Sequence, residues 1–176
     1  MRKERGFTLL ELLTTLGIVA ILATIAVPSF TTTVRHNRSV AATNELHTAL
    51  NYARHTAIIR NSHVVLCKSA DGRRCNHALS DWNDGWLIFD NLNNDAAVQV
   101  NAGEPILRVH GPSRRDAIII SNRSSFTFRP MGTRSVNGTF RYCSAGGKYD
   151  RAVIVNVMGR VRISSKPNAD TTLDCP

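Results

Sequence analysis

The chain begins with an apolar stretch that is long enough to cross a membrane. From Phe7 to Phe30 the only ionisable side chain is Glu11. A helix of about 24 residues, with a rise of 1.5 Å per residue, spans about 36 Å, which exceeds the hydrocarbon thickness of a bilayer. A carboxylate is costly in lipid, so we expect Glu11 to meet a partner there.

A helical pattern continues beyond this stretch. Apolar residues recur at steps of four and three, which marks one apolar face of a helix. The pattern predicts that the helix extends to about residue 60 and that its last part packs on a sheet. The apolar face consists of Ala42, Leu46, Leu50, Ala53 and Ala57.

After residue 61 the pattern changes to short runs rich in β-branched and aromatic residues. Gly, Pro, Asn and Asp separate these runs, as expected of strands joined by turns. Strands that follow one long helix predict an α+β fold, with the N-terminal transmembrane helix packed on a C-terminal globular domain of mostly antiparallel β-sheets. The runs are residues 63–68, 86–90, 106–110, 117–121, 126–129, 139–143, 152–157 and 161–164.

A short basic leader precedes the apolar stretch, and the junction reads GFTLLE from Gly6 to Glu11. An ordinary secretory signal has its small-residue cleavage site after the apolar core, whereas Gly6 precedes it. These residues resemble the class III signal of type IV pilins and pseudopilins. The resemblance implies that a prepilin peptidase cuts after Gly6 and that Phe7 becomes the N-methylated first residue. It also implies that Glu11 pairs with the amino terminus of a neighbouring subunit during assembly.

The expected organisation follows from this signal. Residues 1–6 are the leader, 7–30 the transmembrane and assembly half of the helix, 31–60 its soluble half, and 61–176 the β-rich domain. Before assembly the chain is expected in the inner membrane as a single-pass protein with its soluble domain in the periplasm. After assembly it is expected in a pilus or at the cell surface, where other type IV pilins contact its N-terminal helix.

Positive charge is concentrated in the C-terminal half of the soluble domain. The whole chain carries a formal net charge of +9, and residues 102–176 contribute twelve basic and five acidic groups, a net of +7. Residues 61–101 carry three basic and five acidic groups, a net of −2. This segregation predicts a partner rich in negative charge, such as nucleic acid or anionic lipid.

Four cysteines in an exported domain predict two disulfides. Three pairings are possible, and we favour Cys67 with Cys75 and Cys143 with Cys175. A zinc site near Cys67 is the less favoured alternative, because the spacing matches no common zinc module.

No catalytic motif is evident, so we expect neither an enzyme nor a cofactor. The Asp- and Asn-rich residues 81–95 could suggest calcium, but their spacing does not fit an EF-hand and favours a solvated loop. Trp82 and Trp86 are interpreted as core anchors rather than as base-stacking platforms.

The basic C-terminal half contains one pattern that predicts a binding surface. The segments 152–157 and 161–163 flank a Met-Gly-Arg turn and predict a β-hairpin, in which Gly159 supplies the positive φ. Arg160 and Arg162 are two residues apart, so both point to one face of the hairpin, while Val161 and Ile163 point to the core. Arginine suits phosphate because its planar fork donates two hydrogen bonds. The alternative is that these arginines only protect an exposed edge from aggregation.

The same pattern takes part in a wider resemblance. The order Cys67…Cys75, WNDGW from Trp82, FRPMG from Phe128 and GRVR from Gly159 is similar to the GspH/FimT family of minor pilins and pseudopilins, and most similar to its FimT branch. In FimT-like minor pilins a C-terminal Gly-Arg-x-Arg motif is associated with DNA binding during natural transformation. By position, the motif here is Gly159, Arg160, Val161 and Arg162. Charge adds four further candidates for DNA contact, which are Arg134, Arg141, Lys148 and Arg151.

The resulting hypothesis is a minor type IV pilin that binds extracellular DNA through phosphates, without sequence specificity, for uptake in natural transformation. The alternative is a structural minor pseudopilin of type II secretion, or a pilus-initiation subunit that does not bind DNA. An adhesin for anionic surfaces would use the same charge.

Overall fold

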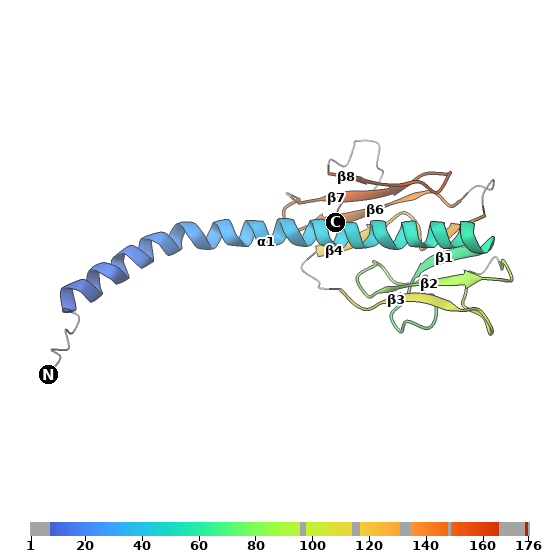
Figure 1. Ribbon diagram of the computed structural model, residues 1–176, viewed down its shortest axis with the longest axis horizontal. Helices are drawn as coiled ribbons and strands as arrows, with labels where there is room; N and C mark the ends of the chain where they lie inside the picture. Colours follow the sequence, from blue (N-terminus) through green and yellow to red (C-terminus); the bar gives the residue numbers. More distant parts are fainter. Residues whose placement is uncertain are drawn as a thin grey trace. The chain divides into compact units, whose positions relative to one another are not determined.

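The computed structural model describes residues 8–95, 98–113, 117–130, 135–147, 149–165 and 175, apart from the side chain of Pro28. These residues form one long helix followed by β-strands, and the chain divides into two compact units at residues 38 and 39 (Figure 1). The elements are α1 (Leu9–Arg60), β1 (His63–Lys68), β2 (Trp86–Asn91), β3 (Ile106–His110), β4 (Ala117–Ser121), β5 (Ser125–Phe128), β6 (Gly138–Ser144), β7 (Arg151–Val155) and β8 (Val161–Ser164).

The first unit, residues 1–38, contains the N-terminal part of α1. By length and composition α1 could cross a membrane, and the large apolar side chains from Leu9 to Phe30 are exposed in the isolated chain. Its threonines satisfy their own hydroxyl groups within the helix, since Thr14 and Thr24 each donate to the carbonyl three residues earlier, at 3.0 and 2.7 Å. Such internal hydrogen bonds are what a lipid environment requires of polar groups.

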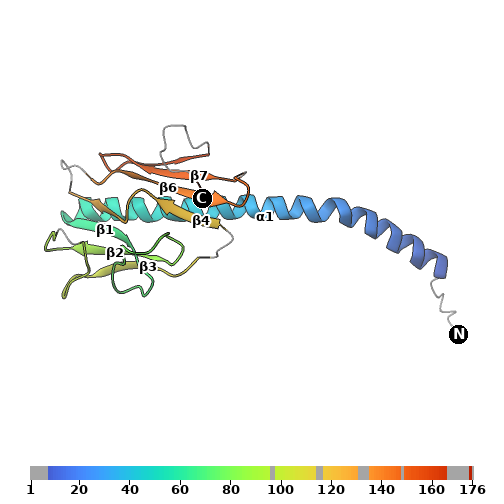
Figure 2. The same ribbon diagram turned by 180° about the vertical axis from the view of Figure 1, so that it is seen from behind.

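The second unit, residues 39–176, contains two four-stranded antiparallel sheets. Their strand orders are β3-β2-β1-β5 and β4-β6-β7-β8, and the strand pairs among the described residues are all antiparallel. Figure 2 shows the two sheets from the side opposite to Figure 1. The predicted α+β fold is therefore confirmed, and each predicted strand run coincides with a strand to within two residues at either end.

The C-terminal part of α1 packs on the sheets through the predicted apolar face. Leu46, Leu50, Ala53 and Ala57 are buried in the main core, and Ala42 is partly buried against it. Small alanines on this face allow the helix backbone to approach the sheets closely. The period of 3.6 residues thus places one side of the helix in the core and leaves the other exposed.

Aromatic side chains join the two sheets within this core. Trp82, from the loop before β2, lies 4.7 Å from the Phe140 ring of β6 and 6.1 Å from the Phe126 ring of β5. Phe126 and Phe140 stack on each other at 4.5 Å. Trp82 is 2% exposed, so it is a core anchor, as the sequence predicts.

The neighbouring Asn83 covers the free edge of β4. Its side-chain Nδ2 donates to the carbonyl of Ala117 at 2.8 Å, and its Oδ1 accepts from the N–H of Ile119 at 2.7 Å. The backbone N–H of Trp82 also donates to the carbonyl of Ile119 at 2.8 Å. The loop that leads into one sheet therefore supplies hydrogen-bond partners to the backbone groups on the edge strand of the other sheet.

Side-chain contacts join the C-terminal part of α1 to the edge strand β3. Glu45 of α1 contacts His110 Nδ1 at 2.8 Å, and the His110 ring stacks on Trp86 at 5.0 Å. Arg108 lies 4.0 Å above the ring of Tyr52. Trp86 is thus occupied by a neighbour within the domain and is not an open stacking platform.

Two disulfides join the cysteine pairs favoured from the sequence, Cys67 with Cys75 and Cys143 with Cys175. The first closes a loop in which the Asp71 carboxylate accepts hydrogen bonds from the backbone N–H groups of Arg73 and Arg74. These hydrogen bonds favour the ionised form and lower the pKa of Asp71 to about 2. No group of three or more metal-ligating side chains occurs among the described residues.

Candidate nucleic-acid interface

Strands β7 and β8 form the hairpin that the sequence predicts, and β8 separates basic from apolar side chains. Val161 is buried and Ile163 packs against the core, whereas Arg160 and Arg162 are exposed. This separation follows from the two-residue period of an extended strand. Within the described ranges, neither arginine forms an ion pair. Two guanidinium groups on one side of the hairpin are therefore available to an anion.

The turn of this hairpin is held by a network of hydrogen bonds. The Oδ1 atom of Asn156 accepts from the backbone N–H groups of Met158 at 3.0 Å and Arg160 at 2.9 Å. The N–H of Gly159 donates to the Asn156 carbonyl at 2.8 Å. Gly159 has a φ of 71°, and a Cβ there would come within 3.1 Å of Ser135 Oγ. Both observations explain why glycine precedes the first arginine.

Arg141 shares the outer face of the sheet with Arg162 but is already engaged. Its Nη2 atom lies 3.4 Å from Asp150 Oδ2, and the two side chains are only 17% and 7% exposed. Asp150 also accepts hydrogen bonds from the N–H and the hydroxyl of Ser144, at 2.8 and 2.9 Å. Arg141 therefore neutralises a buried carboxylate and does not extend the exposed pair of arginines.

Arg151 lies on the other face of the sheet. It stands opposite Tyr142 on β6, so it shares a face with Val153, whose partner on β8 is Ile163. This is the face that packs on α1, and Arg151 is half-buried there. Arg151 thus does not join Arg160 and Arg162 on one surface. The remaining two charge-based candidates, Arg134 and Lys148, lie outside the described residues.

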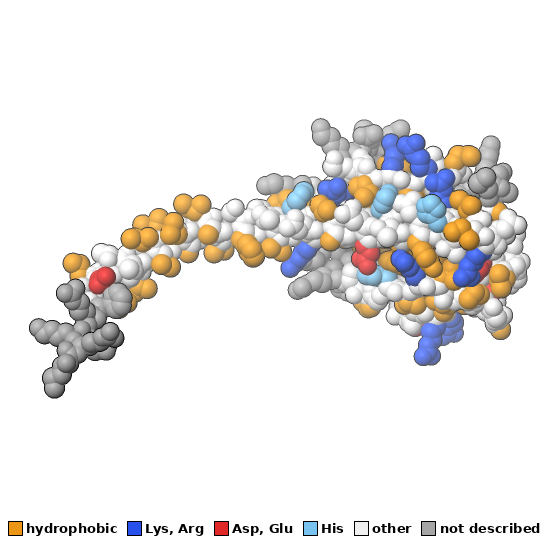
Figure 3. Space-filling view, in the orientation of Figure 1, with side chains coloured by type: hydrophobic (Ala, Val, Ile, Leu, Met, Phe, Trp, Pro, Cys, Tyr) orange, Lys and Arg blue, Asp and Glu red, His pale blue; other side chains and the backbone are white. Residues whose placement is uncertain are grey.

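Arg129, which the charge argument omitted, lies close to the hairpin turn. Its backbone N–H donates to Ser135 Oγ at 3.4 Å, and the N–H of Ser135 donates to the carbonyl of Val157 at 3.0 Å. Arg129 is exposed and follows the buried Phe128 at the end of β5. Alternation along β5 could have indicated its exposure, but not its position beside a hairpin thirty residues later. In Figure 3 one group of basic side chains lies at the β8 edge of the second unit, and other basic side chains are spread over the rest of this face.

At the N-terminus, the helix begins with a cap. The N–H of Glu11 donates to Thr8 Oγ1 at 3.3 Å, and the Glu11 side chain is exposed in the isolated chain. Gly6 and Phe7, the predicted cleavage and methylation positions, lie outside the described residues.

We expect the mature protein to begin at Phe7. Cleavage after Gly6 removes the charged leader and leaves the apolar helix on the mature chain. Mass spectrometry of protein extracted from membranes of cells that contain prepilin peptidase should detect an N-methylated phenylalanine at the first position. An intact Met1, or a cut after the apolar stretch, would contradict this prediction.

Comparison with known proteins agrees with the fold and the N-terminal pattern. The family model described as Type II transport protein GspH matches residues 42–159, and the model of the prokaryotic N-terminal methylation motif matches residues 1–27. No curated protein matches the sequence. A structure of the type IV minor pilin FimU from Pseudomonas aeruginosa PAO1 is 23% identical with a TM-score of 0.55, covering 73% of this chain and 89% of FimU. A second crystal form of FimU is 22% identical with a TM-score of 0.52, covering 70% and 90%.

The fold and the N-terminal motif define the class of protein, which is that of pilin-like subunits with a prepilin-type helix. Members of this class are structural subunits and are not known enzymes. The chain belongs to the GspH family and carries the prepilin-type N-terminal motif, so it is a GspH/FimT-like pilin or pseudopilin subunit. The resemblance found in the sequence is thereby confirmed. Membership implies association with other pilins, processing by prepilin peptidase and anchoring in the inner membrane.

Proposed function

We propose that this minor pilin binds extracellular DNA through Arg160 and Arg162 and so serves DNA uptake in natural transformation. The observation that supports the proposal is an exposed pair of arginines on a hairpin whose turn is stiffened by Asn156. Positions two apart on a strand are separated by about 7 Å, which roughly matches adjacent phosphates on one nucleic-acid strand. A stiff presentation lowers the entropic cost of binding.

Contact with phosphates alone carries no sequence information. DNA of any sequence should therefore bind, and affinity should depend strongly on salt because each neutralised phosphate releases counterions. Arg129, beside the turn, is a further candidate contact. Retraction of the pilus by other machinery would then draw the bound DNA inward.

Each part of the chain has its own location in this role. After removal of residues 1–6, residues 7–30 anchor the subunit in the inner membrane with the globular domain, residues 61–176, in the periplasm. Residues 31–60 form the soluble half of the helix that carries this domain. Incorporation into a pilus then exposes the hairpin at the cell surface, where DNA is available.

A double variant, Arg160→Ala/Arg162→Ala, tests the proposal. Each charge-assisted hydrogen-bonding contact contributes about 1.5–3 kcal/mol, so losing both should weaken binding about 100-fold or more. The slope of log affinity against log salt should fall in magnitude by about two. Titration of labelled DNA with full-length protein in detergent, at several salt concentrations, measures both quantities. In a competent host the variant should lose most transformation while pili still form.

The matched control is Arg73→Ala/Arg74→Ala, which removes the same charge from the exposed disulfide loop. It should leave affinity and slope nearly unchanged. Arg160→Lys/Arg162→Lys should be intermediate, because charge remains but the bidentate grip is lost. Unchanged binding in the double alanine variant would favour the second candidate, a structural subunit of type II secretion or pilus initiation. That candidate is favoured by the family model itself, whose description is a type II transport protein.

A further inference from the structure

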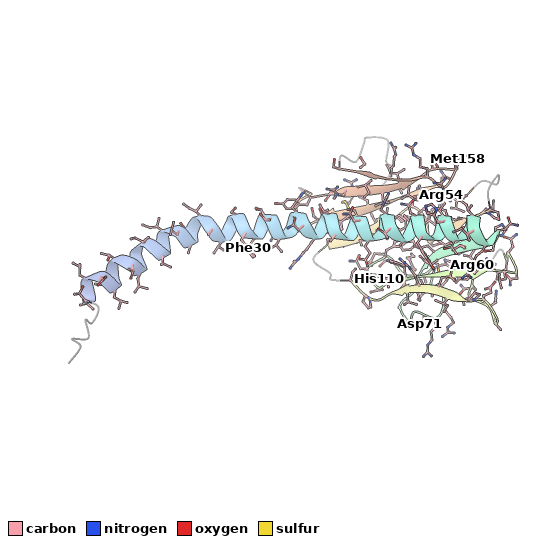
Figure 4. The ribbon with its side chains drawn as sticks, in the orientation of Figure 1. Phe30, Arg54, Arg60, Asp71, His110 and Met158 are labelled. Atoms are coloured by element: carbon pink, nitrogen blue, oxygen red, sulfur yellow. A yellow bond between two sulfur atoms is a disulfide. The ribbon has the colours of Figure 1, made fainter. Side chains whose placement is uncertain are left out.

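The end of the β7–β8 hairpin carries two apolar side chains that folding does not explain. Val157 and Met158 are 45% and 65% exposed, and they lie between Asn156 and the first arginine of the pair. Turns of this kind ordinarily carry small or polar residues. Figure 4 shows Met158 at the end of the hairpin, away from the core.

The backbone holds these two side chains outward. Met158 donates its N–H to Asn156 Oδ1, and the Val157 carbonyl accepts from the N–H of Ser135 at 3.0 Å. Because the backbone on both sides is fixed, the side chains have no route into the core without breaking the turn. Their exposure is therefore a property of the folded protein and not of a loose loop.

Their neighbours are cationic. Arg160 follows Met158 by two residues and is exposed on the same hairpin, and Arg162 lies two residues further along the strand. If both guanidinium groups hold phosphates, as the proposed function requires, the apolar tip lies within reach of the sugars and base edges beside those phosphates. Apolar side chains at such positions, methionine among them, can enter between base steps and unstack them.

We infer that Met158, supported by Val157, acts as a wedge that enters DNA at steps whose stacking is already weak. This inference rests on the proposed function and adds a preference for DNA structure to it. Unstacking an intact base step costs a few kcal/mol, and this cost offsets the favourable free energy of burying the Met158 side chain. The cost is lowest at a mismatch or a nick, so binding is tightest there. The preference concerns deformability and leaves the phosphate contacts independent of sequence.

The experiment compares two duplexes of equal length and charge, one fully paired and one with a central mismatch beside 2-aminopurine. Full-length wild-type protein in detergent should bind the mismatched duplex about tenfold more tightly and raise the 2-aminopurine fluorescence, which reports unstacking. Met158→Ala should lose the tenfold preference and the fluorescence change while keeping the salt slope. Met158→Leu, which conserves volume, should retain both.

Two controls separate this inference from the proposed function. Leu92→Ala removes an equally exposed apolar side chain elsewhere and should behave as wild type (Leu92 is 61% exposed). Arg160→Ala/Arg162→Ala should lower the salt slope on both duplexes. Equal affinity of the wild type for the two duplexes, or a preference that Met158→Ala retains, would overturn the wedge while leaving DNA binding in place. If the protein binds neither duplex, the proposed function itself is overturned, and the wedge with it.

Discussion

A Glu11→Ala variant is expected to enter the membrane as a stable protein and to fail almost completely to enter pili. Glu11 is the only ionisable side chain between Phe7 and Phe30, and a carboxylate in lipid requires a partner. The new amino terminus of a neighbouring subunit is the partner that the prepilin-type signal implies. Immunoblots of sheared pili against membranes, for variant and wild type at equal expression, measure the loss.

A Glu11→Gln variant serves as the control, because Glu11 also takes part in the cap at the start of α1. Thr8 and Glu11 have the spacing of a capping box, and the Glu11 N–H donates to Thr8 Oγ1 at 3.3 Å. Glu11→Gln retains the side-chain length and the capping acceptor but removes the charge. If charge pairing between subunits is the role, Glu11→Gln should fail to assemble as Glu11→Ala does. Normal incorporation of Glu11→Gln would show that the residue acts only as a cap.

The largest effect on stability is expected from Trp82→Ala. Trp82 is 2% exposed and contacts rings from both sheets, Phe126 on β5 and Phe140 on β6. Truncation leaves a cavity where the sheets meet and should lower the free energy of unfolding by about 3–5 kcal/mol, a large part of the 5–15 kcal/mol typical of a domain. Guanidinium unfolding of the full chain in detergent, followed by near-ultraviolet circular dichroism, measures the change.

Two further variants test the cause of that loss. Trp82→Phe keeps an aromatic ring in the same place and should recover part of the stability. Ile59→Ala truncates a side chain that is 82% exposed and should change the unfolding free energy by less than about 0.5 kcal/mol. A loss for Trp82→Ala no larger than that for Ile59→Ala would contradict the role of Trp82 in joining the sheets.

Much of the fold could be predicted because its signals are local. Each strand run is a short alternation bounded by turn residues, and the apolar face of α1 repeats with the helical period, so neither depends on distant residues. The exposure of Arg160 and Arg162 follows in the same way, from the position of Val161 and Ile163 in the same strand. The pairing of Cys67 with Cys75 is also local, since these cysteines are 8 residues apart in the sequence.

Arg141 and Arg151 show what such local signals cannot decide. Both are cations in the basic C-terminal half, and nothing in their immediate sequence distinguishes them from Arg162. Arg141 forms an ion pair with the buried Asp150 and is therefore not available to a ligand. Arg151 lies opposite Tyr142 and so belongs to the core-facing side of the sheet.

The sequence by itself thus determined the elements, the membrane-length helix and the faces of the β7–β8 hairpin, because each depends on residues a few positions apart. Only the tertiary structure decided how the strands divide into two sheets, since β1 pairs with β2 across a long loop and with β5 from beyond three intervening strands. It also decided that Asn83 covers the edge of β4 and that Arg129 lies beside the hairpin turn. These arrangements depend on contacts between distant segments, for which charge and periodicity along the chain contain no signal.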